Sequence, residues 1–168
     1  SLPKGADCPP TRVESEGFDR THLDLPAVQR GLLDAVVAAN ANVVVVLSNG
    51  SVVSLDGIAG RVPAILEAWL GGQASGSAAA DVLFGIAEPG GRLAETIPLR
   101  LADNPAHVNF PGTPKKVVYG ERIYVGYRWY DMTERDVAFP FGFGLSYTTF
   151  ALSDVAVSAP ESGRAHAV

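Results

Sequence analysis

The sequence predicts an α/β domain built as a three-layer sandwich, with a mainly parallel central sheet and helices on both of its faces. Residues 43–47 form an unbroken run of β-branched and apolar side chains, which is typical of a strand covered on both faces. Helical patterns lie before and after the predicted strands, and this alternation favours a layered fold. A single core is expected, because 168 residues suffice for one well-buried domain.

The predicted helices flank the strands. Apolar side chains recur at helical spacing across residues 26–39, Pro26 suits the first turn, and residues 40–42 end the pattern. The apolar stripe consists of Val28, Leu32, Ala35, Val36 and Ala39. A second helix is expected at residues 73–85, which are rich in alanine and end on Gly85, a residue suited to a left-handed stop.

Further strands and loops complete the predicted domain. The apolar run at residues 64–70 fits both the helical and the strand period. Its length and the flanking Pro63 and Gly71 favour a buried strand, with a helix as the alternative. The remaining expectations are a short strand at 93–97, a Pro-rich loop at 102–121, an extended segment at 123–130, a glycine-rich turn at 139–144 and a last strand at 150–157.

Charge and composition argue against several classes of protein. The formal net charge is −5 and the longest basic run is Lys115-Lys116, so nucleic acid is not an expected partner. Residues 43–47 are the longest apolar stretch, far shorter than the roughly 20 residues that cross a bilayer, so no membrane is expected as a partner either. Cys8 is the only cysteine and the histidines lack ligand spacing, so no disulfide, metal or cofactor is predicted.

Carboxylates gather in a short irregular loop near the start of the sequence. A retaining glycosidase needs one carboxylic acid that stays protonated near neutral pH and a second carboxylate as nucleophile. Glu16 suits the first role, because Gly17 leaves room for a sugar ring and Phe18 lowers the local dielectric, which raises the pKa of a carboxyl group. The plainer interpretation is a solvated acidic loop with an exposed contact between Asp19 and Arg20.

Other chemistries fit the sequence less well. Ser15 does not lie in the Gly-x-Ser-x-Gly pattern of a hydrolase nucleophile, and the glycine-rich residues 71–76 lack the lysine of a phosphate-binding loop. An aromatic group could stack on sugars, although packing at a domain edge is the favoured interpretation, as is a core position for Trp69. The aromatic group consists of Tyr119, Tyr124, Tyr127, Trp129 and Tyr130.

Several ordered motifs run along residues 12–150. They are Val13-Glu14-Ser15-Glu16-Gly17-Phe18-Asp19-Arg20, Leu23-Asp24-Leu25-Pro26, Ala64-Ile65-Leu66-Glu67-Ala68-Trp69, Ala80-Asp81-Val82-Leu83-Phe84-Gly85, Pro89-Gly90-Gly91-Arg92-Leu93, Val125-Gly126-Tyr127-Arg128 and Pro140-Phe141-Gly142-Phe143-Gly144-Leu145. In this order they resemble the C-terminal α/β sandwich domain of family 3 glycoside hydrolases of the β-glucosidase type.

The resemblance implies a division of labour with another domain. In such enzymes an N-terminal TIM-like barrel carries the aspartate nucleophile and most of the sugar-binding residues, and this chain lacks that barrel. The implied partners are therefore the barrel domain and a carbohydrate or glycoside substrate, with a homodimer left open. The parent protein is expected to remove terminal β-linked sugars, and the isolated chain to be inactive. The alternative function is a non-catalytic carbohydrate-binding or assembly module on the same fold.

The resemblance also assigns roles within the acidic loop. It implies that Glu16 is the general acid/base, with Glu14 as its rival. Residues that bind substrate or support the acid/base are expected to be Glu14, Phe18, Asp19 and Arg20, the last two as a bracing ion pair.

The sequence departs from the family pattern at two places. The strand expected before the acidic loop is absent, and Glu121-Arg122-Ile123 stands where the family usually has Glu-Gly-Ile. We expect residues 1–20 to form the loop with the acid/base motif, 21–149 the α/β sandwich, and 150–168 the start of a fibronectin-III-like domain or a tail. Both ends resemble cuts through a larger protein, and the compartment is left open.

Overall fold

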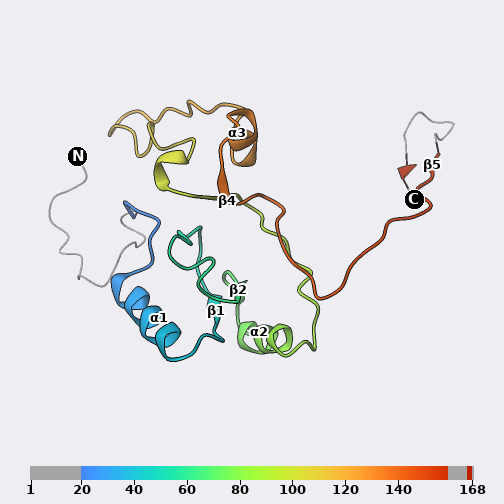
Figure 1. The fold of residues 1–168 in the computed structure, drawn as a ribbon. Coiled ribbons are helices and arrows are strands. Elements are labelled where there is room, and N and C mark those ends of the chain that lie inside the picture. The colour runs from blue at the N-terminus through green and yellow to red at the C-terminus, as the bar shows by residue number, and fades with distance from the viewer. Residues whose placement is uncertain (1–19, 159–165, 168) are drawn as a thin grey trace.

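The computed structural model describes residues 20–158 and 166–167, which form a small α/β domain with an extended C-terminal segment (Figure 1). None of the helices in these residues is both long and apolar enough to cross a membrane. The described strands form three two-stranded sheets, so the predicted α/β class is confirmed, whereas the three-layer sandwich is not.

The centre of the domain is a parallel pair of strands, β1 (Val44–Leu47) and β2 (Ala64–Glu67). Their register pairs Val44 with Ala64 and Leu47 with Glu67, so both strands end at the same edge of the sheet. Both predicted strands are confirmed, and the helical alternative for residues 64–70 is wrong. Within the described residues β1 is covered on one face only, since Val44 and Val46 remain 48% and 43% exposed.

The hydrophobic core lies against the other face of this pair. It is formed largely by the connection between β1 and β2, which contains no helix but buries most of its apolar side chains. The buried cluster consists of Leu47, Val52, Val53, Leu55, Ile58 and Ile97. Burial of one such aliphatic side chain contributes about 1.5–3 kcal/mol, so this crossover loop is a main source of stability.

Helix α1 (Ala27–Ala39) begins after Pro26 and ends at Asn40, as predicted. Its predicted apolar stripe, however, faces outward: Val28 is 80% exposed and Leu32 is 65% exposed. Leu33 packs against the core instead. The helix is apolar on two sides, so its periodicity could not determine which side faces the core.

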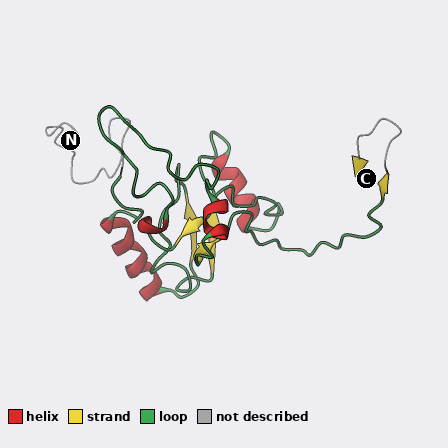
Figure 2. Ribbon diagram, turned by 90° about the horizontal axis from the view of Figure 1, so that it is seen from above, coloured by secondary structure: helices red, strands yellow, loops and turns green. Residues whose placement is uncertain are grey.

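Helix α2 (Ser75–Leu83) lies beside the parallel pair (Figures 1 and 2). It confirms the second predicted helix. Gly85 follows it at a φ of 71°, the left-handed conformation expected of the residue that ends a helix.

A second, antiparallel pair consists of β3 (Ile97–Pro98) and β4 (Val137–Phe139). The strand predicted at residues 93–97 is therefore shorter and later than expected. Leu93 instead exchanges backbone hydrogen bonds with the glycine-rich turn, donating to the Phe143 carbonyl at 2.9 Å and accepting from the Gly142 N–H at 2.8 Å. The turn predicted at residues 139–144 thus packs against the segment before β3.

The segment between β3 and β4 contains a 3-10 helix, η1 (Leu101–Asp103), a long irregular loop, and helix α3 (Tyr127–Met132). The loop confirms the prediction for residues 102–121, but the extended conformation predicted for 123–130 is wrong. Gly126, at a φ of 61°, precedes α3, and its carbonyl accepts from the Trp129 N–H at 3.0 Å. This turn starts a helix where the aromatic content of the segment, which is typical of strands, predicted an extended conformation.

The chain leaves the body of the domain after the glycine-rich turn (Figures 1 and 2). Residues 151–156 contain no strand, so the single strand predicted at 150–157 is wrong except at its end. There β5 (Val157–Ser158) pairs with β6 (His166–Ala167) in an antiparallel hairpin.

Candidate active site

The predicted acid/base loop lies almost entirely outside the described residues. Glu14, Glu16, Phe18 and Asp19 belong to this part of the chain, so their roles stay predictions. Arg20 is the first described residue and the only member of the predicted site with a described position. Its surroundings therefore locate the point at which the acidic loop joins the folded domain.

Arg20 lies against the loop that follows β1. Its guanidinium Nη2 donates a hydrogen bond to Ser51 Oγ at 2.8 Å and another to the Val52 carbonyl oxygen. Val52 is a buried core residue, and Arg20 itself is half-buried. Hydrogen bonds from a charged donor are stronger than neutral ones, so Arg20 attaches the start of the described chain firmly to this loop.

Polar side chains meet at the carboxyl ends of the two parallel strands. Glu67 ends β2, and its Oε1 accepts from the Trp69 backbone N–H at 3.2 Å. Asn49 Nδ2 donates to Glu67 Oε2 at 3.4 Å and to the Ser51 carbonyl at 2.9 Å. In open α/β sheets, ligands bind outside the carboxyl ends of the strands, so this edge is the expected place for a functional group.

Two carboxyl groups near this edge have perturbed acidity. Desolvation by burial raises the pKa of Glu67; hydrogen bonds from Trp69 and Asn49 oppose this, and the charge of Glu95 adds to it. Desolvation also raises the pKa of Glu95, although that residue is exposed as a whole, and the positive charge of Arg20 acts in the opposite direction. The two carboxyl groups and Arg20 therefore form one electrostatic cluster. Carboxyl groups with raised pKa values and a charged neighbour are one indication of a functional site.

An apolar cavity of about 550 Å³ lies next to this edge. It is bounded by β2, α2 and the glycine-rich turn, and Glu67 and Trp69 contribute to its wall. Trp69 also packs against the core, as predicted. The lining is mostly aliphatic and aromatic, with Arg92 as a further charged residue, so the cavity suits an apolar group better than a free sugar.

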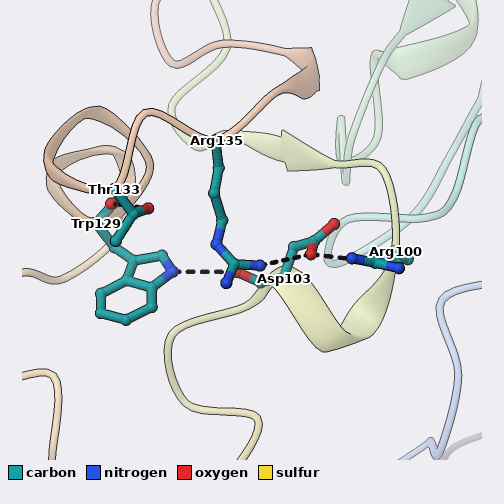
Figure 3. A network of polar contacts seen from close by, with 5 residues as sticks. All are labelled: Arg100, Asp103, Trp129, Thr133 and Arg135. Carbon is teal, nitrogen blue, oxygen red and sulfur yellow. Dashed lines mark hydrogen bonds and ion pairs between the residues drawn. The ribbon is translucent and has the colours of Figure 1, made fainter.

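A separate polar network fixes the long loop to α3 (Figure 3). Asp103, only 6% exposed, accepts through Oδ1 from Arg135 Nη1 at 2.7 Å and from Arg100 Nε at 3.1 Å. Its backbone carbonyl accepts from the Trp129 indole N–H at 3.2 Å, and Thr133 Oγ1 donates to the Trp129 carbonyl at 2.7 Å. A buried carboxylate with these partners is a structural anchor between η1 and α3.

The aromatic group does not form one sugar-binding platform. Tyr130 is buried, Trp129 belongs to the Asp103 network, and the Tyr127 ring stacks on Phe141 with centroids 4.8 Å apart. Tyr119 is 78% exposed on the loop. The favoured interpretation, packing, is therefore confirmed for Tyr127, Trp129 and Tyr130. Among the described residues, no group of three possible metal ligands was found.

The fold and this edge of polar groups define a small α/β domain with a candidate site at the carboxyl ends of its parallel strands. Residues 6–147 match the family model described as "Glycosyl hydrolase family 3 C-terminal domain". The chain belongs to the glycosyl hydrolase family 3 C-terminal domain family, which confirms the resemblance seen in its motifs.

Relatives of known name support this membership. The chain is 54% identical to an exo-α-(1→6)-L-arabinopyranosidase of Bifidobacterium longum, over 89% of this chain and 20% of that protein. It is 53% identical to thermostable β-glucosidase B of Acetivibrio thermocellus, over 88% of this chain and 20% of that protein. The crystal structure of a Bifidobacterium adolescentis GH3 β-glucosidase matches with a TM-score of 0.82 and 55% identity, over 91% and 23% of the two chains. The chain thus spans about a fifth of these relatives' length.

Sequence reasoning missed the polar groups at the strand ends. Asn49, Glu67 and Glu95 were not among the predicted site residues, although Asn49 lies only two residues after the end of the predicted strand at 43–47. That position was a usable signal, because the carboxyl ends of parallel strands are preferred sites for functional groups. Glu67 and Glu95 carried no such signal, since only the folded chain brings Glu67 to Asn49 and Glu95 under the influence of the Arg20 charge.

Proposed function

We propose that the parent protein is a retaining β-glycosidase of the β-glucosidase type, which removes terminal β-linked sugars from oligosaccharides or glycosides. This chain supplies the general acid/base, Glu16, and an N-terminal TIM-like barrel supplies the nucleophile. In this parent protein the α/β domain would be completed to a three-layer sandwich. A homodimer is compatible with the proposal but does not form part of it.

One observation carries the proposal more than any other. Arg20, the last residue of the acid/base motif, is attached to the loop at the carboxyl end of β1. This edge is where α/β domains bind ligands, and the four residues from Glu16 to Arg20 span at most roughly 14 Å. In this proposal Glu16 works near the edge to which Arg20 is attached, where a second domain and its sugar can meet it.

The proposed reaction has two steps. In the first, the protonated Glu16 carboxyl gives its proton to the glycosidic oxygen while the barrel carboxylate attacks the anomeric carbon and the bond to the leaving alcohol breaks. In the second, the Glu16 carboxylate takes a proton from water, the water oxygen attacks the anomeric carbon, and the nucleophile is released. Proton transfer of this kind contributes about 10²–10⁴-fold to the rate.

The identity of the sugar is not part of the proposal. Relatives named as an arabinopyranosidase and as a β-glucosidase are equally similar to this chain, at 54% and 53% identity. The domain therefore does not discriminate between these two names. This agrees with the expectation that the barrel carries most of the sugar-binding residues.

The test is Glu16→Ala in the full-length protein, assayed on aryl β-glucosides and aryl arabinopyranosides. We expect a loss of about 10²–10⁴-fold in turnover and partial recovery with azide, yielding a glycosyl azide of retained configuration. Glu14→Ala is the matched comparison, a neighbouring carboxylate whose expected supporting role predicts a smaller loss and no recovery with azide. Loss and azide recovery in Glu14→Ala instead would transfer the role to Glu14. Robust turnover by the isolated chain would overturn the division of labour, and sugar binding without turnover by the full-length protein would favour the binding-module alternative.

A further inference from the structure

A continuous series of polar contacts joins β2 to Arg20. Glu67, the last residue of β2, accepts from Asn49 Nδ2 at 3.4 Å, and the same amide nitrogen donates to the Ser51 carbonyl at 2.9 Å. Ser51 Oγ in turn accepts from Arg20 Nη2 at 2.8 Å. Each link is part-buried, and the series runs along the shared edge of the two parallel strands.

The parallel pairing determines where this series begins. Leu47 pairs with Glu67 in the register of β1 and β2, so the Glu67 side chain is placed two residues from Asn49 across the sheet. The Glu67 carboxylate is held from its other side by the Trp69 N–H at 3.2 Å. Both N–H donors of the Asn49 amide then have a fixed acceptor, which leaves the side chain a single orientation.

Electrostatics tie Arg20 to the same edge. The Glu95 carboxylate interacts electrostatically with both residues: the positive charge of Arg20 attracts it, and the negative charge of Glu67 repels it. The guanidinium is thus held by two hydrogen bonds to the loop after β1 and by the attraction of a neighbouring carboxylate. Because Arg20 is planar and its donors are fixed, a displaced Ser51 would displace the guanidinium with it.

We infer that Asn49 is a positioning residue for the acid/base loop: together with Glu67 and Ser51 it fixes Arg20, and through Arg20 the direction in which the loop leaves the domain. This inference rests on the proposed function. In this inference Asn49 acts on the loop by holding the Ser51 carbonyl and Glu67, and not by contact with the sugar. A displacement of about 1 Å at a general acid can cost about a hundredfold in rate, so a remote amide is sufficient to control the acid step.

The test compares two substrates that differ in their need for the acid, using the full-length protein. Methyl β-glucoside has a poor leaving group, methanol, which must be protonated as it departs. Dinitrophenyl β-glucoside releases dinitrophenolate, which departs without protonation. Asn49→Asp keeps the shape of the side chain but removes both donors and places a negative charge beside Glu67. We expect kcat/KM to fall about tenfold to a hundredfold on the methyl glucoside and less than about threefold on the dinitrophenyl glucoside.

Two further variants complete the experiment. Ser51→Ala removes only the hydroxyl that accepts from Arg20, so it should fold and shift the two substrates in the same direction by a smaller factor. Asn40→Asp is the control at the opposite end of β1: its side-chain oxygen accepts from the Asn42 N–H at 2.8 Å, a role that aspartate retains. We expect Asn40→Asp to keep wild-type kcat/KM on both substrates.

The outcomes separate this inference from the proposed function. Equal losses on both substrates in Asn49→Asp and Ser51→Ala, or no loss in either, would overturn the positioning role even where Glu16→Ala loses turnover and recovers with azide as proposed. Absence of hydrolysis by the wild-type full-length protein would overturn both. A selective loss on the methyl glucoside in both variants, with Asn40→Asp unchanged, supports the inference.

Discussion

The buried carboxylate of Asp103 offers the sharpest test of what holds the long loop in place. Substitution Asp103→Asn keeps the size of the side chain and removes its charge. Arg135 Nη1, 2.7 Å from Asp103 Oδ1 and on a side chain 39% exposed, then loses its charged acceptor. Arg100 loses less, because its side chain is 74% exposed and solvent screens the pair.

The magnitude follows from the burial of the two partners. A hydrogen bond to a charged group contributes about 1.5–3 kcal/mol, and removing one partner of a buried ion pair costs about 3–5 kcal/mol. Arg135 can reach solvent when its partner is neutralised, so the expected loss of local stability lies near the lower range, about 1.5–3 kcal/mol. The matched control is Asp34→Asn: Arg61 Nη1 lies at the same 2.7 Å, but the two side chains are 43% and 60% exposed. That pair is expected to contribute about 0–1 kcal/mol.

Hydrogen exchange of the full-length protein measures both substitutions locally. Asp103→Asn should reduce the protection of amides in η1 and α3 by about 10–100-fold, whereas Asp34→Asn should change α1 by no more than about fivefold. Similar effects of the two substitutions would show that burial does not set the strength of these ion pairs. An unchanged loop in Asp103→Asn would refute the anchoring role of the network in Figure 3.

Two further predictions concern strain and pH. Arg122 has a φ of 52° where the family pattern has glycine, so Arg122→Gly should relieve backbone strain and stabilise the protein by about 1 kcal/mol. Arg128→Gly, within α3, should instead destabilise the protein by about 1 kcal/mol. Thermal unfolding measures both changes, and a change of the same sign in the two variants would contradict backbone strain at Arg122. Because the pKa of Glu67 is raised above its ordinary value of 4.5, its contribution to the unfolding free energy is fully present below that value and is lost as pH rises through the folded pKa. Urea unfolding across this range should show a decline that Glu67→Gln reduces, and equal slopes for wild type and variant would exclude Glu67 as its source.

Local patterns predicted the elements whose signal lies within a few residues. The β-branched run of β1, the length of β2, and the boundary residues Pro26 and Gly85 each act through backbone preferences that need no tertiary context. The predictions failed where two patterns competed. Residues 123–130 are rich in aromatic side chains, which favour strands, but the turn at Gly126 starts α3 and buries Tyr130.

By itself, the sequence determined the family, the parallel pair of strands and the two longer helices, because these depend on ordered motifs and local periodicity. It also predicted an acid/base loop, which stays a prediction for Glu16. Only the tertiary structure decided which side of α1 faces the core, and that Arg20 meets Ser51 and Asn49 meets Glu67. These contacts join residues 18 to 31 positions apart, and no local pattern carries information about pairs that only the closure of the sheet brings together.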